Sequence, residues 1–265
     1  MNSVVSKDGT RIAFDKTGHG PAVIIVDGAM GSRAAGYSSK LAALLASTFT
    51  VYTYDRRGRG DSGDTQPFAG AREVEDIEAL IGDAGGNSAL VGFSSGGALA
   101  LEAAIALGDK VEKLAIYEAP YDDSAAGIEA WHGYTKALDE DLAAGKRAEA
   151  VTLFMKFVGV SDAMLEGVRT SPMWPMMETV APTLAYDAAA LGADRTVPVE
   201  RAAGVTVPAL LMDGEASAQV MPFMAASADV LARAIPHAER KTLAGQAHDV
   251  SAEAIAPVLV KFLAG

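Results

Sequence analysis

Short apolar runs alternate with helical patterns along most of the chain. Runs rich in apolar, β-branched or aromatic residues occupy positions 22–26, 49–54, 88–93, 111–117 and 208–212. Continuous runs of this length are typical of strands covered on both faces, as in a parallel sheet. Patterns with helical periodicity occupy positions 39–46, 70–81, 97–107, 223–234 and 251–263. Strands that alternate with helices predict an α/β fold with a mainly parallel central sheet and helices on both faces.

Two further strands are predicted near the ends of the chain. Residues 11–15 alternate apolar and polar side chains, which favours an edge strand. Residues 239–243 predict a short edge strand that comes just before the last helix. Both fit at the borders of the predicted sheet.

The alternation of strands and helices breaks between Tyr117 and Val207, where no core strand is predicted. Helical patterns instead follow one another at 128–143, 147–158 and 176–191, and they are punctuated by Pro172, Pro175, Pro182 and Pro198. We therefore predict a helical cap (lid) at residues 119–205, inserted into a core domain made of residues 1–118 and 206–265.

Composition narrows the partners that the chain can have. Half of its 265 residues are hydrophobic and 21% are charged, so it can bury a large core. Its formal net charge of −12 argues against nucleic acid or an anionic membrane as a partner, since both attract positive surfaces. We expect a small-molecule substrate, and a homodimer is compatible with this composition.

Several kinds of chemistry are absent from the sequence. The chain has no cysteine, which excludes disulfides, thiolate nucleophiles and cysteine-ligated zinc. No metal-ligand spacing and no glycine-rich dinucleotide fingerprint occurs, so we expect no cofactor. We see no secretory signal and no apolar run of about 18 residues, so a cytoplasmic location is the expectation.

The clearest chemical motif is the run Gly92-Phe93-Ser94-Ser95-Gly96, which joins a strand pattern to a small-residue helix. A neutral serine hydroxyl is a poor nucleophile and needs a base to remove its proton. Its oxygen must also stand clear of the backbone, which a sharp strand-to-helix turn between small residues allows. The run therefore predicts Ser94 as a nucleophile. The alternative is a serine in a glycine-rich loop at a strand end.

The turn around Ser94 resembles the nucleophile turn of the α/β-hydrolase superfamily, and three other segments match that family in order and spacing. They are Val26-Asp27-Gly28-Ala29, Asp55-Arg56-Arg57-Gly58-Arg59-Gly60-Asp61-Ser62 and Ala244-Gly245-Gln246-Ala247-His248. The resemblance covers nearly the whole chain except the cap. It implies the α/β-hydrolase fold, a triad in the chain order serine, acid, histidine, and an oxyanion hole of two backbone amides.

The resemblance places the catalytic base on the loop before the terminal helix. Of the four histidines, His19, His132, His237 and His248, only His248 lies there. We expect structural or surface roles for the other three, with His132 also a candidate to line the substrate pocket.

The triad acid departs from the family pattern. Most members carry an Asp just beyond the strand that follows the cap, where this chain has the uncharged Ser217. Two replacements are open: Glu118, directly after the run 111–117, and Asp213. Some relatives, such as certain haloalkane dehalogenases, carry the acid after that earlier strand, and parallel strand ends meet in one crevice. We favour Glu118 over Asp213, and a dyad or another acid stays open.

The resemblance also implies that the backbone amides of Ala29 and Ser95 bind the oxyanion. The loop that usually begins His-Gly begins with Asp27 and Gly28 here. Gly28 preserves the backbone path, but a carboxylate near an oxyanion is unfavourable unless it is turned away or paired. Arg33 or a backbone amide are the partners we consider for it.

Two other groups of residues have structural interpretations. The arginine-rich loop at 55–62 could suggest a phosphate site, but the resemblance favours an Arg–Asp network at a strand end. The cap is rich in Met and aromatic residues, most of which we assign to its own core. As a group they favour a partly apolar substrate of modest size.

These features predict a serine hydrolase, carboxylesterase- or lactonase-like, that cleaves an ester, lactone or related acyl bond through an acyl-enzyme. Ser94 would attack the carbonyl, His248 would move the proton and Glu118 would orient His248. A serine nucleophile argues against dehalogenase and epoxide hydrolase activity. The alternatives are a C–C bond hydrolase, a cofactor-free perhydrolase, and a non-hydrolytic lyase or small-molecule binding protein of the same fold.

Overall fold

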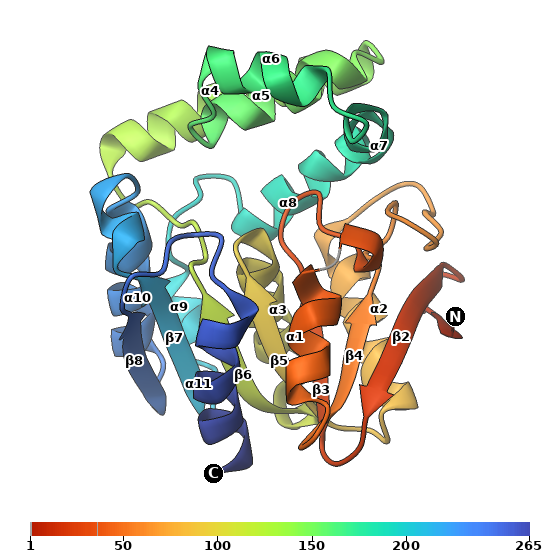
Figure 1. Cartoon of the computed structure of the whole chain (residues 1–265), viewed down its shortest axis with the longest axis vertical. Coiled ribbons are helices and arrows are strands. Elements are labelled where there is room, and N and C mark those ends of the chain that lie inside the picture. The colour runs from red at the N-terminus through yellow and green to blue at the C-terminus, as the bar shows by residue number, and fades with distance from the viewer. Residues whose placement is uncertain (1, 36) are drawn as a thin grey trace.

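The computed structural model describes residues 2–35 and 37–265, and an eight-stranded sheet runs through its centre (Figure 1). The strands, in chain order, are β1 (Asn2–Val5), β2 (Arg11–Gly18), β3 (Ala22–Val26), β4 (Thr50–Tyr54), β5 (Ser88–Phe93), β6 (Val111–Tyr117), β7 (Ala209–Gly214) and β8 (Ala238–Leu243). Their spatial order is β1-β2-β4-β3-β5-β6-β7-β8. β1, β2 and β4 pair antiparallel, and all other neighbours pair parallel. The predicted α/β-hydrolase fold class, with its mainly parallel sheet, is confirmed.

Alternating side chains of the central strands pack into two separate cores, one on each face of the sheet. In β3, Ile24 and Val26 join the core on one face, whereas Val23 and Ile25 join the core on the other. The flanking helices are α1 (Tyr37–Leu45), α2 (Gly70–Asp83), α3 (Ser95–Leu107), α10 (Phe223–Ala234) and α11 (Ala252–Ala264). α1 and α11 cover one face, and α2, α3 and α10 cover the other. Burial on both faces explains why these strands read as continuous apolar runs.

The prediction of an edge strand at 11–15 is wrong in its position. The strand exists as β2, but it lies between β1 and β4, and β1 forms the edge. β1 spans only four residues and three of them are exposed, so its sequence carries little strand signal. β8 forms the opposite edge, as predicted.

Between β6 and β7 the chain is helical. The helices there are α4 (Ala125–Ala143), α5 (Arg147–Phe157), α6 (Asp162–Arg169), α7 (Trp174–Val180), α8 (Leu184–Leu191) and α9 (Val199–Ala202). Figure 1 shows α4 to α7 beyond the end of the sheet toward which the parallel strands point. The helix predicted at 176–191 is two helices, because the 3-10 turn Ala181–Thr183, which contains Pro182, separates α7 from α8. Among the described residues, no helix is both long and apolar enough to cross a membrane.

α8 ties this helical segment to the core. Its Leu184 and Leu191 belong to the same buried cluster as Leu99 and Leu101 of α3, and Figure 1 shows α8 between the outer helices and the sheet. The segment is therefore held by packing on α3 as well as by its two chain connections.

We predict opposite effects for two helical glycines. A Cβ at Gly96 would overlap the carbonyl oxygens of Val26 and Asp27, whereas a Cβ at Gly133 in α4 would meet open space. Gly96→Ala should lower the free energy of unfolding by about 1–3 kcal/mol, because the added methyl group overpacks this contact. Gly133→Ala should raise it by about 0.5–1 kcal/mol, because alanine is the better helix former. Urea unfolding checks both, and equal values for the two variants would contradict the packing argument.

Candidate active site

Ser94 occupies a strained turn between β5 and α3. Its φ is +54°, in the left-handed region that costs a non-glycine residue about 1–3 kcal/mol. A Cβ at Gly92 would come within 2.6 Å of the Cα of Gly97, so the turn needs glycine before and after the serine. The Ser94 N–H donates to the Tyr117 carbonyl at 3.0 Å, which fixes the turn against β6. This geometry lifts the serine hydroxyl away from the backbone.

His248 connects Ser94 to a buried carboxylate. It lies on the loop between β8 and α11, with Nε2 at 3.1 Å from Ser94 Oγ and Nδ1 at 2.7 Å from Glu118 Oε2. The imidazole side chain is 36% exposed, whereas the Glu118 side chain is fully buried. The structure thus brings the three predicted triad residues into one chain of hydrogen bonds, open to solvent at the histidine.

Glu118 is held by groups from the neighbouring strand. Its N–H donates to the Met212 carbonyl at 2.9 Å, and its Oε1 accepts the Gly214 N–H at 2.7 Å. Like Ser94 it has a positive φ, +49°. One carboxylate oxygen is therefore occupied by β7 and the other faces His248, so a buried charge has a partner at each oxygen.

Asp213 faces other partners. Its Oδ1 accepts Arg240 Nη1 and Thr242 Oγ1, both at 2.7 Å, from β8. The structure does not bring Asp213 to His248. Ser217, where the family acid was expected, is buried in a short 3-10 turn, and its hydroxyl has no partner among the described residues.

Tyr117 is a supporting residue that the sequence did not reveal. Its hydroxyl donates to the carbonyl of Ala247 at 2.6 Å, directly before His248. It therefore anchors the histidine loop to β6. Its position inside an apolar strand gave no signal of this role.

The loop after β3 runs beside the nucleophile. A Cβ at Gly28 would lie 2.9 Å from Ser94 Cβ, so only glycine allows this approach. The structure gives the N–H groups of Ala29 and Ser95 no partner among the described residues, and Ser95 is in the first turn of α3, where amides lack helical partners. Met30 follows with a φ of +59°. The oxyanion hole formed by these two amides stays a prediction.

Asp27 is paired with a hydroxyl of α1. Ser38 Oγ donates to its Oδ1, while Arg33 donates to Asp15, Asp55 and Asp61. Burial raises the pKa of Asp27. The carboxyl group is thus engaged by a side chain of α1.

The arginine-rich loop forms buried ion pairs. Arg57 binds Asp8 and Asp76 at 2.8 and 2.7 Å. Arg56 binds Glu73 at 2.7 Å, in agreement with a structural network. All the loop's arginines are at most 1% exposed, which leaves them little access to a free phosphate.

Asp187 of α8 joins the remaining members of this network. It accepts Arg56 Nη1 at 2.5 Å, Arg59 Nη2 at 2.7 Å and Ser95 Oγ at 2.8 Å. Burial would raise the pKa of Asp187, but the two guanidinium groups lower it below its usual value. Nothing in the sequence identified this residue, because it lies in an alanine-rich helix far from every motif.

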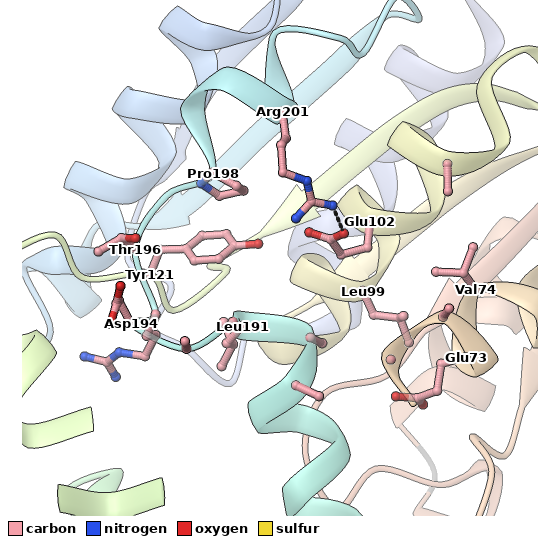
Figure 2. A pocket seen from close by; sticks show the side chains of 18 of the residues that line it. Glu73, Val74, Leu99, Glu102, Tyr121, Leu191, Asp194, Thr196, Pro198 and Arg201 are labelled. Atoms are coloured by element: carbon pink, nitrogen blue, oxygen red, sulfur yellow. Dashed lines mark hydrogen bonds and ion pairs between the residues drawn. The ribbon is translucent and has the colours of Figure 1, made fainter. Parts of the chain in front are cut away.

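A separate cavity of about 550 Å³ lies between α2, α3 and α8 (Figure 2). Glu102 and Arg201 form an ion pair at its wall, and Tyr121 projects toward them. Neither Ser94 nor His248 lines it.

Within the described ranges, no three acidic or histidine side chains are grouped as a metal site would require.

Three aromatic residues of the helices between β6 and β7 contact one another. Tyr134 stacks on Phe157 at 4.4 Å between ring centroids, and Trp131 packs against both. Trp131 and Tyr134 are buried, as expected for the cap's own core. His132 lies on the outside, 56% exposed and paired with Asp194.

We predict that Asp27→Asn changes the pH dependence of stability. Because the folded state raises the pKa of Asp27, it holds this proton more tightly than the unfolded chain does, and stability falls as pH rises above about 4. The variant lacks this loss. Its free energy of unfolding relative to wild type should therefore increase between about pH 4 and pH 8, as measured by urea unfolding. A difference that stays constant with pH would contradict the raised pKa.

Comparison with known proteins places the chain in a family. The model of the alpha/beta hydrolase family matches residues 18–258. A solved alpha/beta hydrolase from Sphaerobacter thermophilus is 47% identical, with a TM-score of 0.88, and the match covers 99% of this chain and 100% of that one.

More distant structures share the fold. An esterase from Thermogutta terrifontis is 21% identical with a TM-score of 0.72, over 99% of this chain and 97% of that one. An enol-lactonase from Burkholderia xenovorans is 22% identical with a TM-score of 0.68, over the whole of both chains. No curated protein matches the chain significantly in sequence. The full-length similarity and the family match together show that this chain belongs to the alpha/beta hydrolase family.

Proposed function

We propose that the protein is a serine hydrolase that cleaves an ester, lactone or related acyl bond of a small, partly apolar substrate. The observation that carries this proposal is the hydrogen-bonded series Ser94, His248 and Glu118, with distances of 3.1 and 2.7 Å. A nucleophile, a base and an orienting acid in this order are the groups that acyl transfer requires.

In the first step, His248 Nε2 takes the proton of Ser94 as Oγ attacks the substrate carbonyl. Glu118 accepts the Nδ1–H of His248, holds the ring in the tautomer that leaves Nε2 free, and stabilises the imidazolium. Because the Gly214 amide fixes the other oxygen of Glu118, the carboxylate stays in place during the transfer.

The tetrahedral intermediate places negative charge on the former carbonyl oxygen. The amides of Ala29 and Ser95 face this charge, and such donors act strongly because they are already oriented before reaction. His248 then gives its proton to the leaving oxygen, which releases the alcohol and leaves an acyl group on Ser94. Water, deprotonated by His248, attacks this ester. His248 then returns the proton to Ser94 Oγ as the C–O bond to the acyl group breaks, and the acid product leaves.

Two features keep the non-hydrolytic alternative open: Asp27 in the oxyanion loop and the uncharged Ser217. Glu118 supplies a carboxylate to His248 without Ser217, and the Asp27 carboxyl is engaged by Ser38. Both observations support hydrolysis over a pure binding role. C–C hydrolysis and perhydrolysis would use the same three groups.

We predict that a fluorophosphonate probe labels the wild type at Ser94 and that the protein hydrolyses p-nitrophenyl esters. Ser94→Ala should abolish both, because it removes the attacking oxygen. Ser39→Ala, at an exposed serine of α1, is the control and should label like wild type. Activity on p-nitrophenyl esters of increasing acyl length measures the size of the acyl group that the site accepts. No labelling of the wild type, or equal labelling of Ser94→Ala, would overturn the proposal.

A second prediction separates the two candidate acids. Glu118→Gln should lower kcat by on the order of 10⁴-fold, because a neutral amide cannot stabilise the His248 cation or fix its tautomer. Asp213→Asn should leave kcat nearly unchanged and lower the melting temperature, since Arg240 loses one of its two charged partners. Steady-state kinetics and thermal unfolding check both. A much larger kcat loss in Asp213→Asn would make Asp213 the triad acid.

A further inference from the structure

The peptide group between Gly28 and Ala29 is held from one side by a buried charge. Arg59 Nη1 donates to the Gly28 carbonyl oxygen at 2.6 Å. The N–H of the same peptide group belongs to Ala29. Because a trans peptide is planar, its C=O and N–H point in opposite directions. Fixing the carbonyl therefore also fixes the direction of the Ala29 N–H.

The same bond acts electrostatically on the amide. Arg59 is 1% exposed, so little water screens its charge. A charged donor on the carbonyl polarises the peptide group and makes its N–H a stronger donor, as in other hydrogen-bond chains in low dielectric. Arg59 thus influences both the direction and the donor strength of the Ala29 amide.

The partner of Arg59 reaches the second amide. Asp187 accepts Arg59 Nη2 through Oδ2 at 2.7 Å and Ser95 Oγ through Oδ1 at 2.8 Å. Ser95 supplies the other candidate oxyanion donor from its backbone. Arg59 itself is fixed by a bond from Nε to Thr183 Oγ1 at 3.0 Å. One ion pair therefore contacts both peptide segments that face the nucleophile.

We propose that the buried Arg59–Asp187 pair positions the oxyanion hole, with Arg59 orienting the Ala29 amide and Asp187 orienting Ser95. The proposal rests on the proposed function, in which these amides bind the oxyanion. Neither side chain touches the substrate, so both are positioning residues. Asp187 comes from α8, so the hole is fully supported only when α8 is packed on α3.

Arg57 provides a comparison within the same loop. It is as buried as Arg59, and its charge is met by Asp8 and Asp76, but its partners belong to the turn after β1 and to α2. These ion pairs are sufficient for an arginine with a purely structural role. Arg59 instead uses one of its nitrogens on the carbonyl of Gly28, next to the nucleophile.

The experiment compares Arg59→Gln with Arg57→Gln in p-nitrophenyl ester hydrolysis. Both variants lose a buried ion pair and should be less stable. Only Arg59→Gln should lower kcat, by about 10- to 10³-fold, with KM nearly unchanged, because an oxyanion donor acts in the transition state. Asp187→Asn and Ser95→Ala should show the same pattern with smaller losses, and they carry the test if Arg59→Gln does not fold.

A second measurement separates positioning from general loss of structure. A trifluoromethyl ketone forms a tetrahedral adduct with a serine nucleophile and places an oxyanion in the hole. Across wild type, Arg59→Gln, Asp187→Asn and Ser95→Ala, its inhibition constant should rise by the same factor by which kcat/KM falls. Arg57→Gln should retain the wild-type inhibition constant.

The outcomes distinguish the two proposals. If the wild type shows turnover that depends on Ser94 but Arg59→Gln is no slower than Arg57→Gln, the positioning role is overturned and the serine hydrolase stands. If the folded wild type shows no Ser94-dependent turnover, the proposed function fails and the positioning role fails with it. Loss of kcat and of ketone binding in Arg59→Gln but not in Arg57→Gln supports both.

Discussion

The site depends on a close approach of backbone at the ends of β3 and β5. These strands are neighbours in the sheet, so the chain segments that leave them run side by side. The start of α3 packs directly on the carbonyls of Val26 and Asp27, which leaves no space for a side chain at Gly96. Because Gly28 has no side chain, the loop after β3 can in turn approach Ser94 closely. With any larger residue at these positions, the serine and the loop amides could not share one small volume.

The close contact between the ends of β3 and β5 places polar backbone groups next to several buried charged side chains. Arg56 and Arg59 are balanced by Glu73 and Asp187, so the four side chains form a group without net charge. Buried ion pairs are a weak source of stability, because the cost of removing charges from water offsets their attraction. Apolar side chains would fill the same volume at similar stability. The charged set makes directional bonds to backbone groups beside Ser94, which apolar side chains cannot make.

The sequence predicted the parts of the site that depend on chain order. Ser94 and His248 could be identified because a strand-to-helix turn and a late loop have recognisable neighbours. The central strands were evident because burial on both faces leaves continuous apolar runs. β1 was missed because it is short and exposed.

The sequence favoured Glu118 over Asp213 but left both open, because the choice depends on which way a side chain points at a strand end. Asp213 follows the alternation of Ala209 and Leu211, whose side chains enter the core covered by α3 and α10. On that side Arg240 holds it, and Arg240 also binds Asp229 of α10. The carboxylate of Asp213 thus completes a contact between β7, β8 and α10.

Two buried carboxylates that contact residues of the site, Glu118 and Asp187, lie on either side of the helices α4 to α7 in the chain. Glu118 directly precedes the helical segment, and Asp187 comes from α8 near its end. Both are buried and bound to core groups, Glu118 to Gly214 and Asp187 to Arg59. The helices between them can therefore differ in length and sequence without displacing either carboxylate, provided that α8 remains packed on α3. Under the proposed function, α4 to α7 would shape the substrate surface, while residues that bracket them would set the geometry of the chemical step.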